Sequence, residues 1–233
     1  VLENAVKIAQ ESKERRVEAL AFLYLGGAYY ELGEFKESIE FFQQTLIIAK
    51  EIKDADLEKS AEKLLVLMEA EKQRKEADRL LQQGVQQYEI SQFREALQSW
   101  EKALQIYQEI KNRQGEAASL DNLGSAYLSL GQYQKAIDYH QENRAIARKI
   151  GDLQGEANSL NNLGVAYQKI NQPAEAIKNL EESLNIILKI RGDISRENIA
   201  GQNRKSFLAS NEKTVITLAT ILIQQNQPEK AFQ

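Results

Sequence analysis

Apolar residues recur along this chain at helical spacing. One clear set is Leu120, Leu123, Gly124 and Tyr127. At about 100° per residue, these positions cluster on one face of a helix. The pattern then returns, because residues 123–127 read LGSAY and residues 163–167, 40 positions on, read LGVAY. An internal period of about 20–50 residues is typical of a solenoid, in which stacked units bury a shared core.

Each period predicts a pair of helices joined by a short turn. In the first complete unit, the residues from Phe22 to Tyr29 lie on a first helix, residues 32–34 form the turn, and a second helix follows over about residues 35–53. The lead-in recurs too, since QGEA stands at both 114–117 and 154–157. The pattern therefore predicts an all-α fold, an α-solenoid of antiparallel helix pairs.

Residues 1–233 are predicted to form a single solenoid. The 40-residue period is interrupted at two places, by the added residues 55–76 and by the insertion 192–211. Gly26 and Gly84 are 58 positions apart, 18 more than the period, and the added residues are interpreted as an additional helix or as an N-terminal extension of the next one. The chain opens and closes within a unit, so we expect it to be part of a longer protein. The predicted segments are the end of a preceding repeat (1–13), a repeat (19–54), the extra helix (55–76), three repeats (77–116, 117–156 and 157–191), an insertion (192–211) and a truncated repeat (212–233).

The composition favours helix and narrows the possible chemistry. The chain has 233 residues with 12 Gly and 2 Pro, and its frequent Ala, Leu, Glu, Lys and Gln are good helix formers. It has no Cys and one His, which excludes a disulfide, a thiolate nucleophile and a Cys- or His-based metal cluster within one chain. We therefore expect no cofactor and no metal. The net charge of −4, with both signs interspersed, gives no basic stripe for nucleic acid.

The apolar runs and the single histidine of the sequence argue against a membrane partner and against catalysis. The longest apolar runs are far short of the roughly 20 residues of a membrane helix, and no signal peptide is recognisable, so we expect a cytoplasmic protein. The one histidine, His140, falls where Phe42 and Trp100 fall in their units, which predicts a core position. No Ser/His/Asp set can be assembled around a core histidine, and we expect no catalytic residues and no enzyme activity.

The repeated residues resemble the tetratricopeptide repeat, whose signature is W-x₂-L-G-x₂-Y, then A-x₃-F, then P. Residues 117–156 match the first part at positions 123, 124 and 127, with Leu120 in place of the Trp, and the second part at Ala136, with His140 in place of the Phe. The closing Pro is absent, so the second helix can continue for more than a turn. This accounts for a period of 40 residues instead of the roughly 34 of the usual tetratricopeptide repeat. This lengthened form looks like the repeats of kinesin light chains and of related bacterial proteins. The resemblance implies a right-handed superhelix with a concave surface that binds proteins.

A narrower resemblance concerns residues 77–84 and the stretch from Ile190 to Gln225. These residues look like the repeat region that precedes a CHAT domain, a relative of caspase-type proteases, in many cyanobacterial proteins. No such domain lies in this chain, so the resemblance implies what the chain is attached to and adds no activity.

Residues opposite the core face of each first helix would line the concave surface of such a solenoid, and these are the candidates for partner binding. They are aromatic and aliphatic in the first units and rich in amides in the later ones. The candidates are Tyr24, Tyr30, Leu81, Gln82, Val85, Tyr88, Asp121, Asn122, Ser125, Asn158, Asn161, Asn162, Gln168 and Lys169.

Asn122 and Asn162 stand at the same place one period apart. An Asn side chain carries both a donor and an acceptor, so each could hold one peptide unit of an extended partner. The competing interpretation is a hydrogen bond to the backbone of the neighbouring unit. Similarly, the candidate tyrosines could anchor an apolar side chain of a partner or pack between adjacent units.

The predicted function is a non-catalytic scaffold that binds a peptide or helix of a partner protein in the concave groove, an inference by analogy from fold to function. The groove has no cluster of Lys and Arg, so a peptide ending in a carboxylate is not the favoured ligand. Two alternatives stay open. One is a sensor arm for an attached CHAT domain, and the other is a self-assembly element that forms homo-oligomers through the ends of the solenoid.

Overall fold

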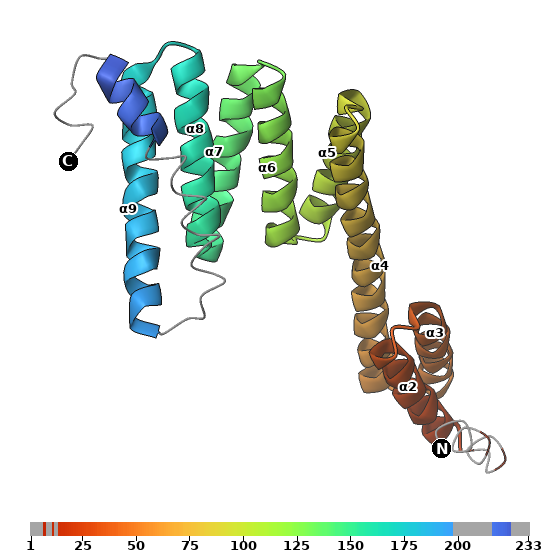
Figure 1. Ribbon diagram of the computed structural model, residues 1–233. Helices are drawn as coiled ribbons and strands as arrows, with labels where there is room; N and C mark the ends of the chain where they lie inside the picture. Colours follow the sequence, from red (N-terminus) through yellow and green to blue (C-terminus); the bar gives the residue numbers. More distant parts are fainter. Residues whose placement is uncertain (1–6, 8–10, 12–13, 198–215, 225–233) are drawn as a thin grey trace. The chain divides into compact units, whose positions relative to one another are not determined.

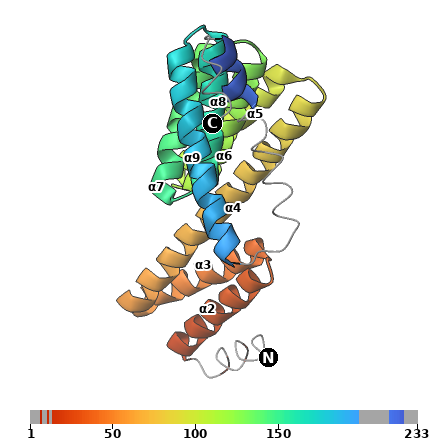
Figure 2. The same ribbon diagram turned by 60° about the vertical axis from the view of Figure 1, so that its left-hand side comes forward.

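The computed structural model describes residues 7, 11, 14–197 and 216–224, with the side chains of 191–197 left undescribed (Figures 1 and 2). Within this part of the chain every regular element is an α-helix, which confirms the predicted fold class. Most of the predicted segments 1–13, 192–211 and 212–233 lies outside the described residues. The chain divides into two compact units, residues 1–76 and 77–233, called here the N-terminal unit and the C-terminal unit.

The N-terminal unit contains one helix pair and the start of a long helix. Helices α2 (Arg15–Glu31) and α3 (Phe35–Ile52) pack against each other, and α4 begins at Ala55. Leu57 of α4 joins Ala19, Ile48 and Ala49 in the buried core of this pair.

The C-terminal unit continues with helices in consecutive packed pairs. The end of α4 packs on α5 (Phe93–Glu109) through a buried cluster that includes Leu80 and Tyr107. Then follow α6 (Arg113–Ser129) with α7 (Tyr133–Ile150), and α8 (Leu153–Lys169) with α9 (Pro173–Glu197). A further helix at 216–224 buries Ile221 against Leu180. First helices of successive pairs also meet, since α6 contacts α8.

Two helices extend beyond the repeat boundaries that the 40-residue period predicts. The predicted extra helix is an extension, because α4 runs without a break over Ala55–Glu89 and includes the first helix of the next repeat. Residues 56–76 contain no Gly or Pro to interrupt it. At the other end, α9 continues to Glu197, so the beginning of the predicted insertion is helical.

A glycine in each first helix lets the second helix of the pair approach closely. A Cβ atom built on Gly26 would lie 2.5 Å from the Phe42 ring, and one built on Gly84 would lie 2.4 Å from Trp100. The same contact joins Gly124 to His140 at 2.7 Å and Gly164 to Leu180 at 2.5 Å. Distances this short leave no room for any side chain, so the repeated glycine is a packing requirement.

The turn inside each pair also repeats one backbone conformation. A positive φ occurs at 33, 91, 131 and 171, with values of 79°, 64°, 74° and 59°. Gly occupies two of these positions, and Ser91 and Asn171 occupy the others, at some cost in strain because side chains disfavour this region.

Adjacent glycines allow a direct test of the packing requirement. Gly26→Ala should lower the free energy of unfolding by roughly 1–3 kcal/mol, because the new methyl group meets the buried ring of Phe42. Gly27→Ala is the matched control, since its Cβ would meet nothing within 4 Å, and the gain in helix propensity should stabilise by up to about 1 kcal/mol. Urea denaturation followed by circular dichroism measures both, and equal effects would contradict the proposed contact.

Candidate functional site

The predicted partner-binding residues fall on the first helices of the pairs, as expected, but they are divided between the two units. Tyr24 and Tyr30 lie on α2 in the N-terminal unit. All the others belong to the C-terminal unit, on the end of α4, on α6 and on α8. Within that unit the three sets are neighbours, because α6 contacts α8 and Leu81 of α4 packs against a cluster that contains Leu123 of α6.

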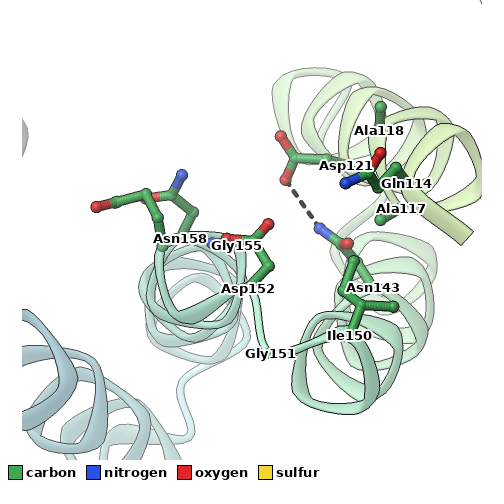
Figure 3. Close-up of a pocket in the computed structure, with 11 residues that line it drawn as sticks. Gln114, Ala117, Ala118, Asp121, Asn143, Ile150, Gly151, Asp152, Gly155 and Asn158 are labelled. Carbon is green, nitrogen blue, oxygen red and sulfur yellow. Dashed lines mark hydrogen bonds between the residues drawn. The ribbon is translucent and has the colours of Figure 1, made fainter. Parts of the chain in front are cut away.

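A pocket of about 560 Å³ opens between α6, α7 and α8 (Figure 3). Of the predicted residues, Asp121 and Asn158 line it. The other predicted residues do not line it. Four polar lining residues were not among the predicted ones: Gln114, Asn143, Asp152 and Gln154.

Three side chains form a polar cluster at the α6–α7 side of this pocket. The amide of Asn143, which is buried, donates a long hydrogen bond of 3.4 Å to Asp121 Oδ1, and Figure 3 shows the two side chains pointing toward one another. His140 Nδ1 lies 3.7 Å from the same oxygen, beyond hydrogen-bond distance. Although 42% of the Asp121 side chain remains exposed, the surrounding protein removes enough water to raise the pKa of its carboxyl group.

His140 occupies the predicted core position and is completely buried. Neither ring nitrogen has a hydrogen-bond partner among the described residues. Burial without a partner disfavours the charged imidazolium, so the pKa of His140 is lowered from 6.5 to about 4. The histidine is therefore neutral near pH 7, where it serves as the ring that packs on Gly124.

An amide side chain stands at one equivalent position in each complete repeat of the C-terminal unit. Gln82, Asn122 and Asn162 are successive members of this row, 40 positions apart. Gln82 is exposed, and the two asparagines are half-buried. None of the three has a side-chain hydrogen bond to another described residue. The competing interpretation of Asn122 and Asn162, a bond to the neighbouring backbone, therefore finds no support here.

The tyrosines divide between the two interpretations that the sequence left open. Tyr88 packs against the rings of Phe93 and Trp100, at centroid distances of 5.2 and 5.7 Å, and its hydroxyl donates to Ser129 Oγ at 2.7 Å. Tyr30 rests edge-on against Phe35 at 5.6 Å. Tyr24 is different, because it is 65% exposed. Tyr88 and Tyr30 thus have structural contacts of their own.

The remaining candidates vary in exposure and contacts. Val85 is 39% exposed, and Lys169 is exposed, whereas Ser125 and Gln168 are half-buried. Asn158 accepts a hydrogen bond from Gln154 at 2.9 Å, within α8. Leu81 and Asn161 are half-buried, and Asn161 has a contact of its own.

The described residues contain no group of three or more His, Asp or Glu side chains that could hold a metal ion. In the same part of the chain, no helix is both long and apolar enough to cross a membrane.

Comparison with known families and structures identifies the repeats. Residues 19–52, 80–149 and 123–189 match the tetratricopeptide repeat family, and together they cover more than half of the sequence. The chain therefore belongs to the tetratricopeptide repeat family, whose fold supports a role as a protein-interaction scaffold. No curated protein sequence matches it.

Several solved structures share this fold at low sequence identity. BtubC (BKLC) from P. vanneervenii has a TM-score of 0.51 and 20% identity, with 99% of this chain and 82% of that chain covered. The apo form of RapI has a TM-score of 0.59 and 15% identity over 99% of this chain, which spans only 56% of RapI. The Rap conjugation gene regulator of plasmid pLS20, solved with the Phr* peptide, has a TM-score of 0.53 and 17% identity, covering 96% and 53%.

The buried histidine predicts a particular dependence of stability on pH. Because the pKa of His140 is lower in the folded chain than in the unfolded chain, the unfolded state takes up the proton first as the pH falls below about 6.5. Wild-type protein should then lose about 2 kcal/mol more stability between pH 8 and pH 5 than His140→Leu, which carries the residue of the equivalent position 180. Urea denaturation at both pH values measures the difference, and parallel losses in the two proteins would refute it.

Proposed function

We propose that the C-terminal unit binds an extended segment of a partner protein across the first helices α4, α6 and α8. The observation that carries this proposal is the row formed by Gln82, Asn122 and Asn162, whose amides have no hydrogen-bond partner among the described residues. Each amide offers one donor group and one acceptor, the same pair that a peptide unit needs. A row of such groups can therefore hold a backbone regardless of its side chains.

An extended chain that crosses these helices would meet the row at regular intervals. Packed helices lie about 8–10 Å apart, and an extended chain advances about 3.3 Å per residue. Successive amides would thus meet about every third residue of the bound segment. Side chains between these points would face the pocket, Val85 and the exposed parts of the helices.

The comparisons are consistent with this mode of binding. The structure of the pLS20 regulator contains the Phr* peptide, which shows that a protein of this fold can hold a peptide. At 17% identity the likeness concerns the fold alone, so the proposal for this chain depends on its own amide row.

The two alternative functions stay predictions. A sensor arm requires a CHAT domain elsewhere in the parent protein, and a self-assembly element requires a mass that rises with concentration in sedimentation. Neither is favoured by a particular contact among the described residues.

Selection of random peptides on the immobilised protein tests the proposal. Phage-displayed peptides that are retained are synthesised, and their dissociation constants are measured by fluorescence anisotropy. Asn122→Ala combined with Asn162→Ala should weaken binding at least about 10-fold, because up to four hydrogen bonds to the peptide backbone are lost. Tyr88 is left intact, since its removal would disturb the packing on Trp100.

The matched control is Gln98→Ala combined with Asn185→Ala, which removes two exposed amides from the second helices α5 and α9. This variant should bind the peptides as wild type does. Equal weakening in both variants, or failure to recover any peptide, would argue against a groove that binds extended segments.

A further inference from the structure

The third complete repeat, residues 117–156, departs from its neighbours at three positions that meet in space. Asp121 stands where the two preceding repeats have leucine, at 23 and 81. His140 replaces the apolar residues at 42, 100 and 180, and Asn143 stands where Thr45 and Ser183 stand in the first and fourth repeats. The repeat architecture therefore does not require any of these three polar side chains.

The hydrogen bonds of the other repeats confirm that Asn143 is used differently. Thr45 and Ser183 donate to the carbonyl groups of Ala19 and Ala157, which are equivalent to each other on the first helices. Asn143 instead extends its amide to the Asp121 carboxylate. The side chain that ties the two helices together elsewhere is here turned toward the pocket.

This polar cluster is poorly satisfied within the chain. Asp121 accepts one long hydrogen bond of 3.4 Å, although a carboxylate offers about four acceptor sites. His140, fully buried beside it, has no partner for either nitrogen among the described residues. Polar groups withdrawn from water in this way cost free energy unless a partner compensates. Asp121, which lines the pocket, is therefore the member of this cluster with acceptor sites that a ligand could reach.

The charge of the pocket selects the kind of group. Among the lining residues the charged side chains are Asp121 and Asp152, and none is a cation. Asp152 caps α8 by accepting from the Gly155 amide at 2.9 Å, which leaves Asp121 as the carboxylate with most capacity to spare.

The arginines on α6 and α7 form ion pairs with glutamate side chains, and Asp121 is not one of their partners. Arg113 pairs with Glu116 at 2.5 Å, Arg148 pairs with Glu156 at 3.3 Å, and Arg144 pairs with Glu182. The pocket therefore presents net negative charge together with the amide oxygens of its lining.

We propose that this pocket receives an arginine side chain of the bound segment, with Asp121 as its ionic partner and the amide oxygens of Gln114 and Asn158 as further acceptors. A guanidinium group has five N–H donors in a planar fork, which suits several acceptors better than the compact ammonium of lysine. This inference deepens the proposed function, on which it rests for the identity of the occupant. Asp121 and Asn122 are consecutive residues of α6, which places the pocket next to the amide row.

The test uses two small probes that differ in charge but little in shape, N-acetyl-arginine methylamide and N-acetyl-citrulline methylamide. Each is titrated into the ¹⁵N-labelled full chain, and the side-chain amide signals of Asn143 and Asn158 are followed by NMR. The arginine probe should shift these signals along a saturable curve. The citrulline probe should bind at least about tenfold more weakly.

Variants assign the charge to one residue. Asp121→Asn should reduce arginine binding to the level of citrulline, and so should Asp121→Leu, which installs the residue of the two preceding repeats. Asp138→Asn on α7 removes an exposed carboxylate outside the lining and should leave the curve unchanged. Equal binding of both probes, or equal effects of Asp121→Asn and Asp138→Asn, would overturn the inference.

The outcomes also separate this inference from the proposed function. If the arginine probe fails while the selected peptides still depend on Asn122 and Asn162, only the arginine pocket is wrong. If no peptide binds the chain at all, the proposed function fails, and the inferred occupant falls with it.

Discussion

The close approach of two helices at a glycine is the contact on which each repeat depends. Where the first helix carries Gly26, Gly84, Gly124 or Gly164, the facing position of the second helix brings a large side chain against the bare backbone. Dispersion forces fall steeply with distance, so a pair held this closely gains contacts that a pair separated by a methyl group would lose. The core face of each first helix is thereby fixed, and its opposite face is left free.

That free face can change composition without loss of the fold. Because the glycine contact and the buried apolar residues set the packing, an exposed residue such as Gln82 is under little packing constraint of its own. Repeat architectures commonly separate a constant core from a variable surface in this way, since each unit contacts only its neighbours. Binding residues can therefore accumulate on one face.

The third repeat shows how far the core itself can depart from the apolar pattern. His140 fills the space against Gly124 as Phe42, Trp100 and Leu180 fill it in the other repeats, but it brings two nitrogen atoms into a dry environment. The shape of the ring preserves the packing, while its polarity costs free energy. The adjacent Asp121 and Asn143 line the pocket, so the polar departures of this repeat lie together.

The sequence by itself determined the period, the helix pairs and the face on which candidates such as Asn122 and Asn162 lie, because helical spacing fixes which residues share a face. It could not reveal that α4 is one continuous helix, since a stretch without Gly or Pro suits a separate helix equally well. Only the tertiary structure decided that the Tyr88 ring packs against Trp100. The structure also decided that Asn143 and Asp152 lie around the same pocket as Asp121. These neighbours come from different helices, and their meeting depends on packing distances that no spacing along a single helix contains.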